Sequence, residues 1–253
     1  MNLKRYRGLL IPVLLIVLWE VGAQFDILPP DTMSRPSEIA VAGWNALLDG
    51  SLLLATLQTF ETALLGLAVG SIIGIMLGIL IGLSPVLEGV IGPTLDTIRP
   101  VPAVALIPLA LLIYGFGVRM EVLVVTFACI WPVLIVTVSA VRGIEPRLTE
   151  VARTLEMPAL SRMRLIVLPA ALARIAVGIR VAAGVALVVA VTVEIVLNPQ
   201  GLGYGMIIAA QSLRPELMWA EMLWVGLAGW AFNRLLTTID RRWLLRYQPG
   251  GAR

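Results

Sequence analysis

The sequence contains no histidine and one cysteine, and Lys4 is its only lysine. The absence of histidine excludes Ser-His triads, histidine general bases and histidine metal ligands. Cys129 lies within an apolar run, so the chain has neither a disulfide framework nor a cysteine metal site. With no lysine after a glycine-rich loop, the chain lacks the Gly-Lys-Ser/Thr motif that holds nucleotide phosphates. If a nucleotide drives this protein, a second chain must bind it.

Charged residues are also scarce, at 14% of the chain, whereas hydrophobic residues make up 59% and the mean hydropathy is +0.94. Soluble domains contain only about 45–50% apolar residues. Several long apolar runs within 253 residues therefore predict an all-α, polytopic integral membrane protein. The net charge of +3 does not indicate nucleic-acid binding, because the basic residues border the apolar runs.

Six segments are apolar enough to be interpreted as transmembrane helices. They cover residues 8–23, 62–83, 101–118, 122–141, 171–197 and 217–239. The first follows a basic N-terminus and could alternatively be the hydrophobic region of a signal peptide. We favour a retained span, because no clear small-residue cleavage site follows it. In the loop after it, residues 37–48 could form an interfacial helix with Trp44 at the membrane boundary.

The basic residues orient these six spans. With both termini in the cytoplasm, 14 of the 19 basic residues fall in cytoplasmic loops and tails. The external loops contain only Arg35, Arg119 and Arg214, and the other two, Arg174 and Arg180, lie in the inner half of the fifth span. Inverting the topology would reverse this ratio, so the positive-inside rule predicts that both termini are cytoplasmic.

The loop of residues 142–169 is a charged segment in an otherwise apolar chain. Its first part predicts a short helix, for which Pro146 suits the first turn. Pro158 is expected to end this helix by disfavouring α geometry at Met157. Apolar residues at i, i+3, i+4 and i+7 form one face of it: Leu148, Val151, Ala152 and Leu155.

A second short helix is predicted from a Ser161 cap to Leu168, with a stop at Pro169. Together the two helices would form a compact amphipathic pair between two membrane spans. Such a pair is suited to contact with another molecule.

The pattern Glu150-x-Ala152, followed by position 156 and by Leu168-Pro169, resembles the EAA loop of binding-protein-dependent ABC transporter permeases. In that family the loop is the coupling helix, which docks into a groove on a separate ATPase subunit. The spacing from Glu150 to Pro169 matches without a gap. One departure is Glu156, which replaces the family's glycine, and we expect Pro158 to break the helix there instead. The alternative is an ordinary amphipathic cytoplasmic loop.

Three further segments resemble the nitrate/sulfonate/taurine branch of this family. They are Leu28-Pro29-Pro30 with Arg35-Pro36-Ser37, the run from Arg99 to Leu109, and Gly201-Leu202-Gly203. The resemblance implies a type I ABC importer permease fold with an N-terminal part (residues 1–51), a transmembrane core (52–241) and a cytoplasmic tail (242–253).

The resemblance also implies a location in the bacterial inner membrane, partners and a role. The partners would be a second permease copy, two ATP-binding subunits that hold ATP and Mg²⁺, an external solute-binding protein and membrane lipid. The cargo would be a small anion such as a sulfonate, taurine or nitrate. This chain itself would need no cofactor or metal and would have no catalytic residue. The residues implied in ATPase coupling are Glu150, Ala152, Leu155, Glu156, Arg153, Leu148, Val151 and Pro169.

Glycine recurs at every fourth position of the second span, at Gly66, Gly70, Gly74, Gly78 and Gly82. In lipid, helices associate through close contact, which glycine permits. We therefore favour tight helix packing over a direct transport role for these five glycines.

Candidates for the translocation pathway lie in the later spans. Pro108 interrupts the third span and Tyr114 is near its end, while Trp131 precedes a proline in the fourth. Arg180 and Glu194 are charges within the fifth span, and they are about 21 Å apart along a helix, which is too far to pair. Intramembrane charges often face a polar interior, although both side chains could instead extend toward the membrane surfaces.

Two other functions remain open at this stage. An ion-coupled secondary transporter or channel could use Glu61, Glu194 and Arg180 as a relay, but we find no inverted repeat. An intramembrane enzyme would need paired carboxylates, and no two lie at i, i+3 or i+4 within a predicted span.

Overall fold

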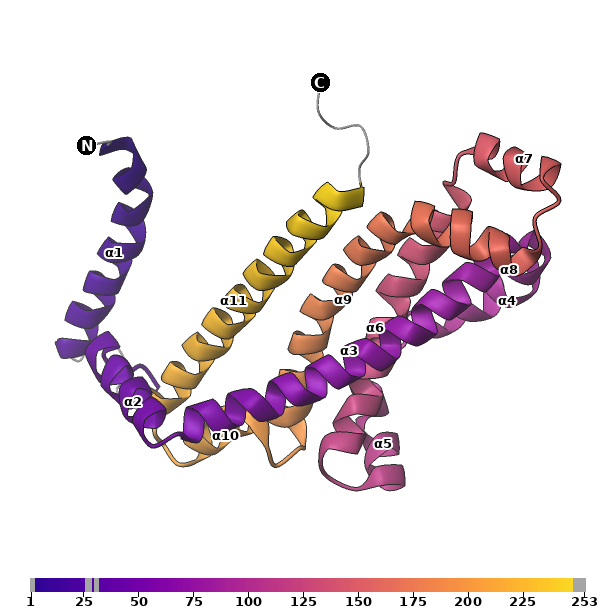
Figure 1. Cartoon of the computed structure of the whole chain (residues 1–253). Helices are drawn as coiled ribbons and strands as arrows, with labels where there is room; N and C mark the ends of the chain where they lie inside the picture. Colours follow the sequence, from indigo (N-terminus) through magenta and orange to yellow (C-terminus); the bar gives the residue numbers. More distant parts are fainter. Residues whose placement is uncertain (1–2, 26–28, 30–31, 248–253) are drawn as a thin grey trace. The chain divides into compact units, whose positions relative to one another are not determined.

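The computed structural model describes residues 3–25, 29 and 32–247, which form helices and no strand (Figure 1). The motif residues Leu28 and Pro30 and the tail residues 248–253 lie outside the described residues. The chain divides into two compact units. The first comprises Met1–Gln58 and Glu194–Ala228, and the second comprises Thr59–Val193 and Gly229–Arg253. Three long helices contribute to both: α3 (Ser51–Leu83), α9 (Leu168–Val196) and α11 (Pro215–Tyr247).

The first unit contains α1 (Leu3–Gln24), α2 (Pro36–Leu48) and α10 (Gly201–Gln211). The Ser37 backbone N–H and hydroxyl donate to the Glu20 carboxylate, at 3.0 and 2.8 Å, which ties the start of α2 to α1. The Trp224 indole donates to the Thr56 hydroxyl at 2.8 Å. α2 occupies the segment predicted as an interfacial helix. The apolar core of this unit contains Ala46, Leu52 and Leu202.

The second unit contains two longer helices, α4 (Pro85–Ile98) and α6 (Val118–Arg142), and several short ones. The short ones are the 3₁₀ helix η1 (Ala103–Leu106), α5 (Ile107–Tyr114), α7 (Pro146–Thr154), α8 (Ala159–Arg162) and the π-helical turn η2 (Met163–Val167). Small residues let α3, α6 and α9 approach closely in its main core. The buried members of that core are Ala63, Leu67, Val125, Cys129, Val133, Ala182, Ala183, Ala186 and Ala190.

The glycine ladder of α3 lies against α6. A Cβ atom at Gly66, Gly70, Gly74, Gly78 or Gly82 would come within 2.5–2.9 Å of an α6 atom. At Gly74 the obstructing atoms are the Ile130 carbonyl oxygen and the Val133 Cβ, both 2.9 Å away. The four-residue spacing therefore corresponds to a continuous line of backbone contact, because each glycine faces the same neighbour.

We expect Gly74→Leu to lower the thermal stability of the detergent-solubilised protein. Overpacking a filled contact costs about 1–3 kcal/mol, and here the obstruction includes the backbone of α6. The matched control is Gly226→Leu in α11, where a Cβ meets no atom within 4 Å. An equal melting temperature for Gly74→Leu and the wild type would contradict this packing.

The predicted third span, residues 101–118, is not one helix. Its helical residues are those of η1 and α5, which together rise only about 18 Å, whereas the hydrocarbon core is about 30 Å thick. The predicted loop 84–100 is instead largely α4, and α4 meets the η1–α5 segment at an angle of 84°. Prolines at 100 and 102 separate the two parts, because proline disfavours helical geometry in the preceding residue.

Three helical segments are long and apolar enough to cross a membrane: Ser51–Leu83, Val118–Arg142 and Ala159–Gln211. The bent pair of α4 and the η1–α5 segment makes a fourth if it is a single span. α1 contributes only a shorter apolar stretch, Leu10–Gln24. In α11, tryptophans and charged residues interrupt the apolar sequence. Six spans remain a prediction, as do the domain boundaries at residues 51 and 241.

Candidate functional site

The coupling-loop candidate begins with α7, which starts at Pro146 as predicted. The helix ends earlier than expected, and by a different mechanism. The Met157 N–H donates to the Ala152 carbonyl at 3.0 Å, and the Glu156 N–H donates to the Arg153 carbonyl at 3.1 Å. This pair of bonds is a Schellman motif, in which the residue after the cap adopts left-handed geometry.

Glu156 provides that left-handed residue, with φ +48°. The expectation that Pro158 would break the helix in place of the family's glycine is therefore wrong, because the chain makes the left-handed turn with a glutamate. The Cβ atom in this conformation costs roughly 1 kcal/mol relative to glycine.

The second predicted helix, Ser161–Leu168, also differs from the structure. α8 begins at Ala159 with Pro158 as its N-cap, so Ser161 is not a cap. η2 then leads directly into α9, which starts at Leu168. Pro169 does not stop the helix. It is the second residue of α9 and directly follows the π-helical turn η2, so the helical path from α8 continues through it.

The predicted apolar face of α7 divides into one buried residue and three exposed ones. Ala152 is 2% exposed and packs inward, whereas Leu148, Val151 and Leu155 are 40%, 51% and 66% exposed. Glu150 is also exposed. The helix thus presents three apolar side chains and a carboxylate outward.

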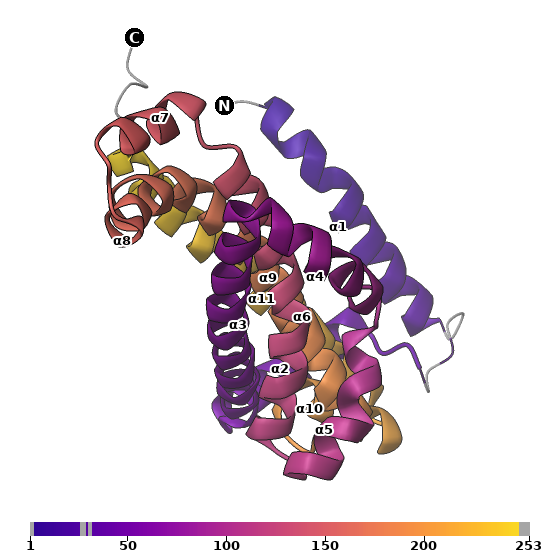
Figure 2. The same ribbon diagram turned by 90° about the vertical axis from the view of Figure 1, so that its right-hand side faces the viewer.

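Both ends of the loop are anchored in the second unit (Figure 2). A buried cluster packs the end of α6 against η2 and the start of α9, and it contains Ala140, Val141, Val167, Ala171 and Ile175. Arg142, the last residue of α6, forms an ion pair with Glu88 of α4. Gly143 leaves room for the Arg174 guanidinium, which a Cβ at this position would displace. The exposed side chains of α7 therefore stand on a packed base.

Glu194, a predicted pathway residue, makes a structural contact in the first unit. Its carboxylate is 1% exposed and accepts a hydrogen bond from the Gly203 N–H in the first turn of α10, at 2.8 Å. Gly201, at φ +85°, leaves the space that this carboxylate fills. The Gly201 N–H donates to the Gln58 side chain at 3.0 Å. The glycines of the segment 201–205 thus let a buried acid reach the N-terminal amides of α10.

A second buried carboxylate, Glu121, is not among the site residues predicted from the sequence. It is fully buried in the first turn of α6 and accepts a hydrogen bond from the Thr62 hydroxyl of α3. Its position just before the apolar run of residues 122–141 made it look like part of a loop. The available signal was an acidic residue at a helix N-terminus, where the helix dipole stabilises negative charge.

The other pathway candidates are spread over α5, α6 and α9. Trp131 packs edge-on against Phe127, with ring centroids 5.5 Å apart, and lines a cavity of about 180 Å³ with Asp96 and Arg99 of the α4 segment. Pro108 and Tyr114 are exposed on α5. Arg180 is half-buried on α9. Trp131 thus borders a cavity whose lining combines charged and apolar side chains.

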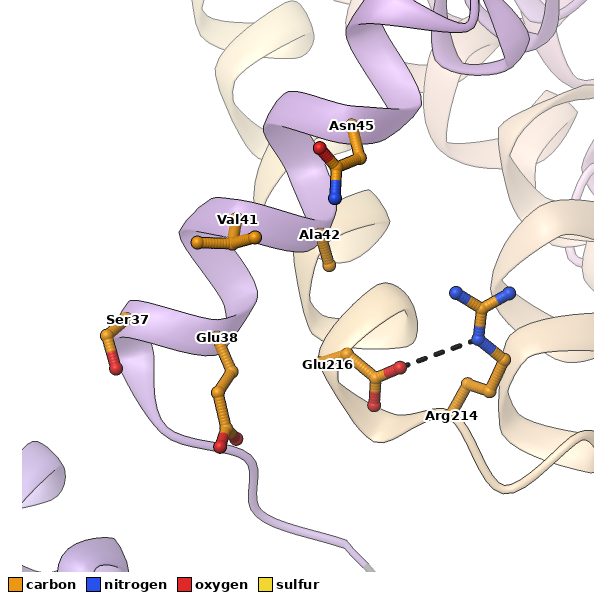
Figure 3. A pocket seen from close by; sticks show the side chains of 7 residues that line it. All are labelled: Ser37, Glu38, Val41, Ala42, Asn45, Arg214 and Glu216. Carbon is orange, nitrogen blue, oxygen red and sulfur yellow. Dashed lines mark hydrogen bonds and ion pairs between the residues drawn. The ribbon is translucent and has the colours of Figure 1, made fainter.

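A shallow pocket of about 400 Å³ lies in the first unit, on the side predicted to be external (Figure 3). Glu38 and Asn45 of α2 line one side, and Arg214 and Glu216 line the other. The Arg214 Nε lies 3.5 Å from a Glu216 carboxylate oxygen. The exposed charges of this pocket can form ion pairs with another molecule.

Asp49 lies four residues after the pocket residue Asn45 and two residues before the start of α3. Hydrogen bonds from Ser51, including one from its backbone N–H at 2.8 Å, lower the pKa of the Asp49 carboxyl. Asp49, the C-cap residue of α2, is therefore an anion whose carboxylate accepts a hydrogen bond from the first residue of α3.

The long apolar helices are those of a polytopic membrane protein, and the amphipathic loop between two of them is exposed. Residues 70–244 match the family described as "Binding-protein-dependent transport system inner membrane component". The chain therefore belongs to this family, the permease subunits of ABC importers.

Individual relatives agree with this assignment. The chain is 30% identical to the putative aliphatic sulfonates transport permease protein SsuC of Bacillus subtilis, over 95% of this chain and 88% of that protein. It is 36% identical to the riboflavin transport system permease protein RibX of Chloroflexus aurantiacus, over 76% of this chain and 71% of that protein. Among solved structures, it resembles an amino acid ABC transporter with histidines, at a TM-score of 0.63 and 19% identity, covering 78% of this chain and 97% of that chain. This last likeness concerns the fold alone.

Proposed function

We propose that this chain forms the translocation pathway of an ATP-driven importer for a small anion and couples to a separate ATP-binding subunit through residues 147–169. Membership of the family implies an ATP-binding subunit and a solute-binding protein as partners. A pair of permease copies and a pair of ATP-binding subunits complete the proposed assembly. The residues that we propose for the pathway are Arg180, Trp131, Tyr114 and Pro108. Glu194 is proposed to support the pathway by holding the N-terminus of α10 in place.

One observation supports the coupling proposal above the others. Leu148, Val151 and Leu155 are exposed on a short helix that is fixed at both ends, beyond the apolar spans. When a partner covers exposed apolar side chains, the burial stabilises the complex by about 25 cal/mol per Å² of apolar surface. A groove on an ATP-binding subunit would cover all three. Closure of two such subunits on ATP would then move the loops, while no bond in the cargo changes.

The cargo is proposed from the branch resemblance and from the sulfonate permease, which matches nearly the whole chain. An Arg180 side chain that faces the pathway would suit an anion. The test is uptake of radiolabelled taurine by proteoliposomes that contain the permease with its ATP-binding subunit and solute-binding protein. Competition by alkanesulfonate or nitrate, and none by riboflavin, would support an anion. Competition by riboflavin alone would contradict it.

The proposal places α7 and α8 in the cytoplasm and the segment after α10 outside. We expect Ser212→Cys to react with a membrane-impermeant thiol reagent in intact cells, and Ala159→Cys to react only after the cells are opened. Both positions are exposed, so burial does not explain a difference between them. The native Cys129 is fully buried and provides the unlabelled baseline. The reverse labelling pattern would contradict the topology and, with it, coupling through this loop.

A further inference from the structure

The tip of the coupling-loop candidate has an unusual residue in a demanding conformation. Glu156 and Leu213 are the two non-glycine residues with positive φ in the described part of the chain, at +48° and +53°. Each follows a helix that ends in a Schellman motif. After α10, the Arg214 N–H donates to the Ala209 carbonyl at 2.9 Å, as Met157 does to Ala152 after α7. Glycine is favoured at such positions because it has no Cβ.

Within the described part of the chain, no hydrogen bond or ion pair accounts for the glutamate. The Glu156 side chain is exposed, and among the described residues its carboxylate takes part in no hydrogen bond or ion pair. By contrast, a carboxylate oxygen of Glu145, the residue before α7, lies 3.8 Å from the Arg147 guanidinium. The chain thus retains a strained, charged residue at the tip without an internal interaction that compensates for the strain.

The surroundings of Glu156 indicate the partner. The preceding Leu155 is the most exposed of the three apolar side chains on α7, at 66%. A groove that covers Leu155 also removes water from the adjacent Glu156. A desolvated carboxylate is strongly destabilising unless a cation or several hydrogen bonds satisfy it.

We propose that Glu156 is a recognition contact for the ATP-binding subunit, whose groove presents an arginine or lysine at this point. This inference rests on the proposed coupling function and adds a charge requirement to it. The apolar contacts of α7 then supply affinity, and the Glu156 pair selects the cognate subunit over one with a neutral or acidic groove.

The test measures two quantities, the melting temperature of the permease and its Kd for the purified ATP-binding subunit in nanodiscs. Glu156→Gly removes both the strain and the charge, so the melting temperature should rise while Kd increases about tenfold at low salt. Because salt screens charge pairs, the difference in Kd should shrink near 1 M NaCl. Glu156→Gln keeps the strain and removes only the charge, so it should weaken binding without raising the melting temperature.

Leu213→Gly is the matched backbone control. It relieves the same conformation at an exposed position on the predicted external side, so it should raise the melting temperature and leave Kd unchanged. If Glu156→Gly and Glu156→Gln bind the ATP-binding subunit as tightly as the wild type at every salt concentration, the recognition contact is wrong and coupling is unaffected. If the wild-type permease itself does not bind, the coupling function fails, and the inference fails with it.

Discussion

The double variant Glu150→Ala, Leu155→Ala should lose its ATP-binding subunit on purification while the permease itself stays folded. Truncating Leu155 removes about three carbons from the proposed contact, worth roughly 2 kcal/mol at about 0.8 kcal/mol per CH₂. Replacing Glu150 leaves any donor in the partner unsatisfied, which costs about 1–3 kcal/mol more. Together these losses weaken binding by about two to four orders of magnitude.

Both side chains are exposed in the permease, so the double variant should melt at the wild-type temperature. The measurement is the ratio of ATP-binding subunit to permease after affinity purification from membranes, with ATP hydrolysis as a second readout. Leu213→Ala, Glu216→Ala is the control, because it changes the same residue types on the predicted external side. A double variant that retains its partner, or a control that loses it equally, would contradict the assignment of α7.

Gly201→Ala should destabilise the protein by about 2–5 kcal/mol. The new Cβ would lie 1.9 Å from a Glu194 carboxylate oxygen, so α10 or the carboxylate must move. The left-handed φ costs about 1 kcal/mol, and overpacking adds about 1–3 kcal/mol. Movement also weakens the hydrogen bond from Gly203 to Glu194, which leaves a buried carboxylate less well satisfied.

The variant Gly50→Ala separates the cost of the left-handed φ from the cost of overpacking against Glu194. Gly50 has a similar φ, +80°, but a Cβ there meets no atom within 4 Å, so only the conformational cost applies. The measurement is thermal unfolding in detergent, followed for the wild type and both variants. If the two variants lower the melting temperature equally, the contact between Gly201 and Glu194 does not contribute, and the cap of α10 is assigned incorrectly.

The elements that local sequence patterns specify were predicted well. The helix predicted at residues 37–48 and the start of α7 at Pro146 both appear at the expected positions, because a proline at the first helical turn is a local signal. The glycine at every fourth position likewise identified a packing face on α3, because residues four apart lie on the same face of a helix. The spacing of the glycines could not predict that α6 packs against this face, because that depends on the tertiary fold.

Other features depended on competition between local and tertiary effects. Pro169 looked like a helix stop, yet it fits the first turn of α9, and η2 joins the two helices. Residues 101–118 have the composition of a span, but two prolines and the turn at Gly115 confine the helix to part of them. Apolar content alone does not report where the backbone bends.

In the candidate site, too, some features were predicted from the sequence and others required the folded chain. The spacing from Glu150 to Pro169 located the coupling-loop candidate, whereas the left-handed conformation of Glu156 was not anticipated. Among the intramembrane charges, Glu194 was identified from its charge alone, but its hydrogen bond to α10 required the folded chain. Glu121 was missed because its partner, Thr62, is distant in the sequence.

The most direct test of ATP-driven import is solute uptake by proteoliposomes that contain the permease, the ATP-binding subunit and the solute-binding protein. We predict uptake that requires ATP, stops without the ATP-binding subunit and is unaffected by ionophores that collapse proton and sodium gradients. Uptake by the permease alone, driven by a proton or sodium gradient and unaffected by ATP, would instead show a secondary transporter and contradict the account.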